Sequence, residues 1–166
     1  MPSEADRQSK SANLEHLAFS TEDLACLLEK ARDLHGHLGP FLVVGVRAGL
    51  RGLRELQARK ENLDLSAKAR LTYSVPYSCI LNGIQVATGC TIGNTRLTYE
   101  DSSNPMILFR NKAGRAVTVS ILPEAIDELM QQLAKDAPAE ETAHKAAAMA
   151  EEELFKVAPA LTVAPA

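Results

Sequence analysis

Two glycines four residues apart, Gly45 and Gly49, lie inside an apolar segment, residues 41–58, that otherwise has the spacing of a helix. Pro40 suits its first turn, because an N–H group at that position would have no intrahelical acceptor. A glycine inside a helix costs about 1 kcal/mol relative to alanine. The pair therefore indicates close approach by another backbone or by a ligand, and we favour tight packing against a second helix.

Further helices and strands follow from the periodicity of the apolar residues. Helical spacing is found over residues 21–34, 79–88, 123–135 and 138–157, and Leu24, Leu27, Leu28, Ala31 and Leu34 form the predicted core face of the first of these. Alternation typical of strands is found over residues 68–75, 96–101, 105–110 and 116–122. We expect the last two strands to pair as a hairpin, because residues 111–114 have the composition of a turn.

The composition is that of one globular domain with its own core: 166 residues, 46% hydrophobic and 23% charged. Eighteen basic and twenty-one acidic residues give a net charge of −3, which disfavours general nucleic-acid binding. We find neither a signal-peptide stretch nor an apolar run long enough to cross a membrane, and we expect a cytoplasmic protein. Residues 1–18 are expected to be flexible, residues 19–157 to form the domain, and residues 158–166 to be a disordered tail.

Two histidines, His35 and His37, lie in a glycine-rich connection between the first two predicted helices. Imidazoles two residues apart do not share a helix face, but an irregular backbone can direct both at one point. Such a pair suits a metal ion or proton transfer. The alternative is that one imidazole only caps the last carbonyls of the preceding helix.

A second cluster extends from Cys79 to Gly93. If residues 79–88 are helical, Cys79, Asn82 and Gln85 wind along one side of that helix. A cysteine at a helix N-terminus has its thiolate favoured by the helix dipole, which helps both nucleophilic attack and metal ligation. Cys90 follows Gly89, the expected terminator of the helix. The alternative is that both cysteines are small buried apolar residues, which is the role we assign to Cys26.

Three arginines, Arg47, Arg51 and Arg54, share one face of the glycine-containing helix. Together they could hold a phosphate or a carboxylate. We favour a structural role for this stripe, because the same helix carries apolar residues that must be buried. Arg47, Asn82 and Gln85 remain weaker candidates for binding a cofactor or substrate.

The segments HGHLGPFLVVGVRAG, residues 35–49, and CILNGIQVATGCTIGN, residues 79–94, together resemble the FmdE family. This family is named for the E gene product of formylmethanofuran dehydrogenase operons. The resemblance implies an α+β domain of helices packed on an antiparallel sheet, often forming a homodimer. It also implies a metal site, with zinc as the first expectation and nickel, iron or copper as alternatives. Carried over by position, the candidate metal ligands are His35, His37, Cys79 and Cys90.

The sequence departs from the common family pattern at three positions. Many relatives have cysteine in place of Gly39, an acid in place of Asn82 and lysine near Asn94. An amide in place of an acid removes a possible general base. Longer relatives also carry a C-terminal four-cysteine zinc ribbon, which has no counterpart in this sequence.

Three functions follow as hypotheses. The first is a metal-binding accessory protein that serves an oxidoreductase or one-carbon metabolism. The second is an enzyme that acts on a small anionic or one-carbon substrate, either through a metal or through Cys79 activated by a histidine such as His35, with Arg47 orienting the anion. The third is an interaction module in which the cluster is only structural.

Overall fold

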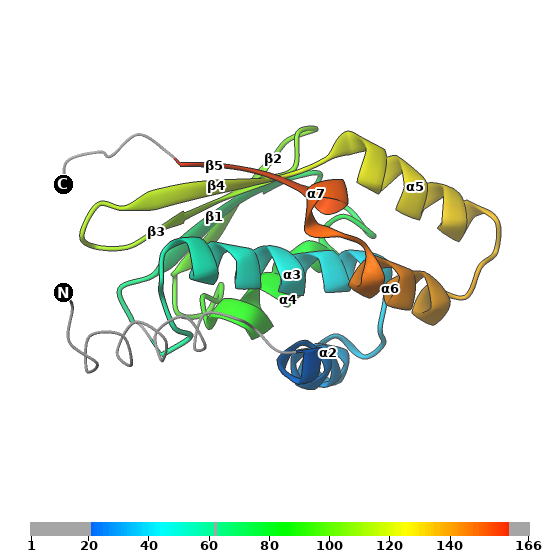
Figure 1. Ribbon diagram of the computed structural model, residues 1–166, viewed down its shortest axis with the longest axis horizontal. Helices are drawn as coiled ribbons and strands as arrows, with labels where there is room; N and C mark the ends of the chain where they lie inside the picture. Colours follow the sequence, from blue (N-terminus) through cyan, green and yellow to red (C-terminus); the bar gives the residue numbers. More distant parts are fainter. Residues whose placement is uncertain (1–20, 62, 160–166) are drawn as a thin grey trace, which may run out of the picture.

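A computed structural model describes residues 21–61 and 63–159 of the chain, so the terminal segments predicted to be flexible lie almost entirely outside the described residues. Six helices and five strands are described, in the order α2 (Thr21–His35), α3 (Pro40–Glu55), β1 (Ser66–Leu71), α4 (Cys79–Thr88), β2 (Leu97–Asp101), β3 (Met106–Arg110), β4 (Ala116–Ile121), α5 (Pro123–Ala134), α6 (Ala139–Ala148), α7 (Glu151–Leu154) and β5 (Phe155–Pro159). The α+β class expected from the sequence is confirmed (Figure 1).

The five strands form one sheet in the order β2-β1-β3-β4-β5. β3 and β4 pair as the predicted antiparallel hairpin, with Ile107 opposite Val119. β1 runs antiparallel to β3 but parallel to β2. The sheet is therefore mostly antiparallel, as expected, with one parallel pair at the β2 edge. The parallel pair arises because α4 lies between β1 and β2 in the chain and provides the crossover that parallel strands need.

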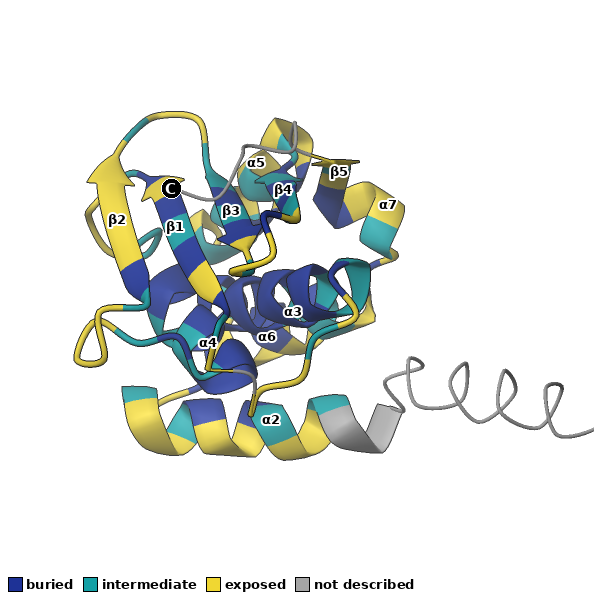
Figure 2. Cartoon of the chain, turned by 90° about the vertical axis from the view of Figure 1, so that its left-hand side faces the viewer, coloured by how far each residue is buried: buried dark blue, intermediate teal, exposed yellow. Residues whose placement is uncertain are grey.

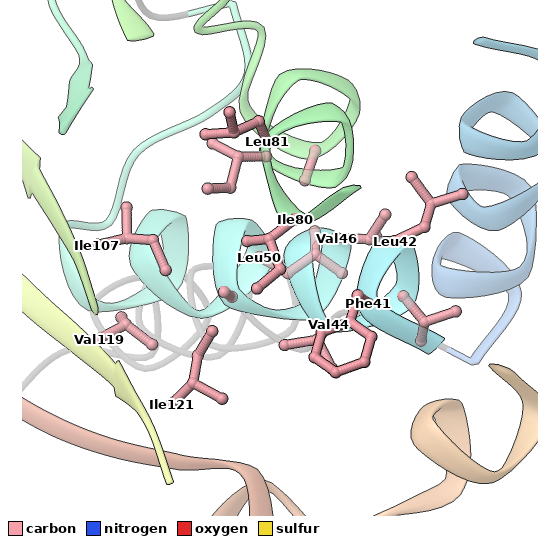
Figure 3. Close-up of a cluster of buried hydrophobic side chains, with 14 of the residues drawn as sticks. Phe41, Leu42, Val44, Val46, Leu50, Ile80, Leu81, Ile107, Val119 and Ile121 are labelled. Carbon is pink, nitrogen blue, oxygen red and sulfur yellow. The ribbon is translucent and has the colours of Figure 1, made fainter. Parts of the chain in front are cut away.

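Helix α3 lies between the sheet and the pair α2 and α4 (Figure 1). One side of α3 meets the strand residues Ile107, Val119 and Ile121, and another side meets Ile80 of α4 (Figure 3). Twelve of the sixteen residues of α3 are buried. A helix enclosed in this way explains why its sequence is apolar around most of its circumference.

Glycines bring α3 and α4 into backbone contact. A Cβ atom added at Gly45 would lie 2.2 Å from the carbonyl oxygen of Ile80, and one added at Gly83 would lie 2.4 Å from the carbonyl oxygen of Leu42. At Gly49 the nearest atom to an added Cβ would be the Cβ of Ala87, at 2.7 Å. The prediction that Gly45 and Gly49 serve tight helix packing is confirmed.

The C-terminal region differs from the single helix predicted over residues 138–157. The helical run stops at Met149, whose backbone is extended, with φ −61° and ψ 143°, and the short helix α7 and strand β5 follow. β5 pairs antiparallel with β4, so that Phe155 lies opposite Ile121 and is 6% exposed. Pairing with the open edge of the sheet and burial of Phe155 override the helical preference of this Ala/Glu-rich segment.

Helix α2 lies on the outside of the molecule (Figure 2). Its inner face contributes Leu28 and Ala31 to the core, as predicted, but Leu34 at its end is 55% exposed. The strand predicted over residues 68–75 ends at Leu71. None of the described helices has both the length and the apolar character that crossing a membrane would require.

Candidate functional site

The two histidines lie where the chain turns from α2 into α3. α2 ends at His35, and Gly36 leaves it with φ +96° while its N–H group donates to the carbonyl of Arg32 at 2.7 Å. Only glycine adopts this φ readily. Two residues later Gly39 precedes Pro40, the first residue of α3. This short connection holds His35 half-buried and His37 exposed at one corner of the molecule.

The two imidazoles are neighbours, as the sequence predicts. Their ring centroids are 4.7 Å apart and the ring planes are inclined by 42°. A Cβ atom at Gly39 would lie 3.6 Å from Nε2 of His37, so a side chain at position 39 would be in van der Waals contact with this ring. Burial, and then the nearby charge of His37, lower the pKa of His35 below its ordinary value. His35 is therefore neutral near pH 7.

A series of hydrogen bonds connects His35 to the far end of α4. Nδ1 of His35 lies 2.8 Å from Nδ2 of Asn82. Gln85, one turn further along α4, donates from Nε2 to Oδ1 of Asn82 at 3.4 Å. The backbone N–H of Ile92 donates to Oε1 of Gln85 at 3.0 Å. We call these three side chains and the Ile92 amide the amide chain.

The two cysteines of the predicted site are buried thiols. Cys79 begins α4 and is 9% exposed, and burial raises the pKa of its thiol. This direction is opposite to the shift expected for a cysteine at a helix N-terminus, and its largest cause is the loss of hydration on burial. Cys90 is completely buried and donates its S–H to the carbonyl of Leu65 at 3.4 Å. Burial raises the pKa of the Cys90 thiol as well.

The four predicted metal ligands do not converge. Cys79 and Cys90 lie at opposite ends of a helix of ten residues, which corresponds to about 15 Å along its axis. Within the described ranges, no three His, Cys, Asp or Glu side chains are grouped so that they could hold a metal ion. The expectation of one site built from all four side chains is thus corrected: the fold brings the two histidines together and leaves Cys90 elsewhere.

Arg47, predicted as a weak ligand-binding residue, has a structural role. Its Nη1 atom donates to the carbonyls of Ala146 and Met149, at 2.8 and 2.6 Å, where α6 ends. Burial lowers the pKa of its guanidinium. Arg51 and Arg54 both contact the carboxylate of Glu151. The structural interpretation of the arginine stripe is confirmed, and the anion that it binds belongs to the chain itself.

Cys26 is exposed, which corrects its assignment as a buried apolar residue. It lines a pocket of about 310 Å³ beside Leu27, Lys30 and Leu53.

Two groups that take part in the amide chain and in the contacts of the arginines could not be identified from the sequence. The Ile92 amide is a backbone group, and Glu151 lies in an acidic run with nothing to distinguish it from its neighbours.

The family model described as FmdE, molybdenum formylmethanofuran dehydrogenase operon, matches residues 34–165. The chain belongs to the FmdE family. The match includes both the histidine connection and all of α4.

Two individual proteins are similar to this FmdE chain. A tungsten formylmethanofuran dehydrogenase FmdE-like protein from Syntrophus aciditrophicus has a crystal structure that superposes with a TM-score of 0.62 at 19% identity, covering 86% of this chain and 73% of that one. At this identity the likeness supports the fold alone. A probable S-adenosyl-L-methionine-binding protein from Archaeoglobus fulgidus is 33% identical over 104 residues. That alignment spans 62% of this chain and only 28% of the relative.

Proposed function

We propose that this FmdE-family chain is an accessory protein that binds a transition-metal ion, with zinc as the first candidate, through the imidazoles of His35 and His37. The single observation that carries the proposal is the adjacency of the two rings, whose centroids are 4.7 Å apart. Neutral imidazole is a common ligand of zinc, nickel and copper.

The residues at this corner fit an open site rather than a closed structural one. Structural zinc sites use four protein ligands. Here two imidazoles are adjacent, Cys79 is buried with a raised pKa, and Cys90 lies at the far end of α4. When bound, the ion would supply a Lewis-acidic centre with coordination positions not filled by this chain. Weak, exchangeable binding suits an accessory role, and the family description refers to the operon of an oxidoreductase.

The test is a zinc titration of metal-free protein in competition with a chromophoric chelator. We expect one zinc site, and we expect His35→Ala and His37→Ala each to lower its affinity by about tenfold or more, since each removes one of the few ligands. Cys90→Ser is the matched control, because this thiol lies at the other end of α4. Cys79→Ser and Cys90→Ser are both expected to bind like the wild type.

Three results would overturn the proposal. The wild type could bind no zinc, or the histidine variants could bind it as tightly as the wild type. Cys79→Ser could also abolish binding, which would show that Cys79 is a ligand and that the site is not built from two imidazoles alone. The same metal-free protein is titrated with S-adenosylmethionine, the ligand in the name of the Archaeoglobus relative. Binding of that compound in place of zinc would assign the site to a small organic ligand instead.

A further inference from the structure

We infer that the backbone N–H of Ile92, acting through Gln85 and Asn82, holds His35 in the tautomer that carries its proton on Nε2. Residues 82 and 85 would then be positioning residues, because they determine which nitrogen of the His35 ring carries the proton and which carries the lone pair. This tautomer does not depend on any bound metal. Its consequence for zinc affinity rests on the proposed function.

The direction of the amide chain is set at its Ile92 end. Oxygen and nitrogen of a side-chain amide exchange places by a half-turn, so their assignment depends on their partners. A backbone N–H can only donate, and the Ile92 N–H lies 3.0 Å from the Gln85 amide. Gln85 must therefore present its oxygen to Ile92, which leaves its NH₂ group facing Asn82.

The same reasoning gives the direction of the next two hydrogen bonds, from Gln85 to Asn82 and from Asn82 to His35. Asn82 receives the Gln85 NH₂ group at 3.4 Å on its oxygen, so its own NH₂ group faces Nδ1 of His35 at 2.8 Å. A donor facing Nδ1 requires a lone pair on that nitrogen. In a neutral imidazole the proton then resides on Nε2. The free side of the ring is thus a hydrogen-bond donor.

This tautomer opposes metal binding on the free side of the ring, because a metal ligand needs a lone pair there. Metal-ligating histidines usually donate their other N–H to an acceptor, which fixes the opposite tautomer. For His35 to do so, the Asn82 amide must turn over and lose its contact with Gln85. We therefore expect the wild-type chain to bind zinc weakly, at a level set by residues 82 and 85.

Replacing Gln85 by glutamate reverses the direction of the hydrogen bonds in the amide chain and leaves His35 and Asn82 unchanged. A carboxylate only accepts hydrogen bonds, so it would accept from both Ile92 and the Asn82 NH₂ group. Asn82 would then present its oxygen to His35, and the proton would move to Nδ1. Gln131→Glu makes the same change of charge on the exposed face of α5 and is the matched control.

The tautomer is read from two-bond ¹H–¹⁵N correlations of ¹⁵N-labelled, metal-free protein, with the His35 signals identified by their loss in His35→Gln. We expect the proton on Nε2 in the wild type and in Gln131→Glu, and on Nδ1 in Gln85→Glu. A proton on Nδ1 in the wild type, or an unchanged tautomer in Gln85→Glu, would overturn the inference. Asn82→Asp, whose carboxylate would accept from Nδ1 directly, serves as the second variant if Gln85→Glu does not fold.

Zinc affinity is measured on the same samples. We expect Gln85→Glu to bind zinc on the order of tenfold more tightly than both the wild type and Gln131→Glu. If the tautomer changes as expected and none of the samples binds zinc, the proposed metal-binding function is overturned while the tautomer assignment stands. If the tautomer changes and zinc binds with unchanged affinity, the link between the amide chain and metal binding is overturned.

Discussion

At the scale of single residues, burial decides the chemistry of the cysteines. Cys79 has the position at a helix N-terminus that normally favours a thiolate, yet its side chain is 9% exposed and burial raises the pKa of the thiol. An enzyme that used Cys79 as its nucleophile would need the opposite shift. The arrangement therefore disfavours the hypothesis of a cysteine-dependent enzyme.

The burial of Cys79 and the raised pKa of its thiol predict slow alkylation of this residue. With iodoacetamide near pH 7, we expect the exposed Cys26 to react first. We expect the Cys79 thiol to react more slowly by a factor on the order of ten or more, because it is shielded from the reagent and burial keeps it protonated. Peptide mapping by mass spectrometry at successive times measures each rate, and Cys26→Ser isolates the buried thiols. Faster labelling of Cys79 than of Cys26 would restore the nucleophile hypothesis.

At the scale of elements, the contact between α3 and α4 determines where the candidate site lies. Backbone contact at Gly45 and Gly83 sets the position of α4, and α4 carries Asn82 to His35. The periodicity predicted both helices and the need for close packing. The sequence alone does not indicate how one helix is rotated relative to the other, so the contact between Asn82 and His35 could not be predicted.

Gly45→Ala tests this contact. An added Cβ would lie 2.2 Å from the Ile80 carbonyl oxygen, so the helices must separate. We expect a loss of about 1–3 kcal/mol in the free energy of unfolding, net of the helix propensity that alanine gains. Gly93→Ala is the control, since its added Cβ would approach nothing nearer than 3.9 Å and is expected to change stability by less than about 0.5 kcal/mol. Equal effects in urea denaturation would contradict the packing role.

At the scale of the whole molecule, the C-terminal region is attached to the core through α3. Arg51 and Arg54 bind Glu151, and Arg47 binds the end of α6. Burial by itself would raise the pKa of the Glu151 carboxyl, but hydrogen bonds and charge from Arg54 and Arg51 hold it below its ordinary value. A carboxyl with a lowered pKa in the folded state stabilises the fold above its unfolded pKa, and this contribution is lost as the pH falls through the folded value.

Glu151→Gln is therefore expected to lower the free energy of unfolding near pH 7 by about 1–2 kcal/mol. The difference from the wild type should shrink in acid, as the pH falls through the lowered pKa of the wild-type carboxyl and that group becomes protonated. Urea denaturation at a series of pH values measures this. Glu152→Gln, in the same short helix but with an exposed side chain, is the control. A difference that does not vary with pH would contradict the ion-pair role.

The sequence by itself determined what depends on local periodicity and on backbone chemistry. It predicted the helices around Gly45 and Asn82 and the hairpin of β3 and β4, because apolar spacing and turn composition act over a few residues. The FmdE resemblance was also contained in the sequence and is confirmed. Zinc binding and a homodimer stay predictions.

Only the tertiary structure decided which distant groups meet. It separated Cys90 from the histidines, turned Arg47 toward the end of α6, and made a strand of Phe155–Pro159. It also joined Ile92 to His35 through two amides. These outcomes depend on burial and on pairing between segments far apart in the chain, where the free energy of a contact exceeds any local preference.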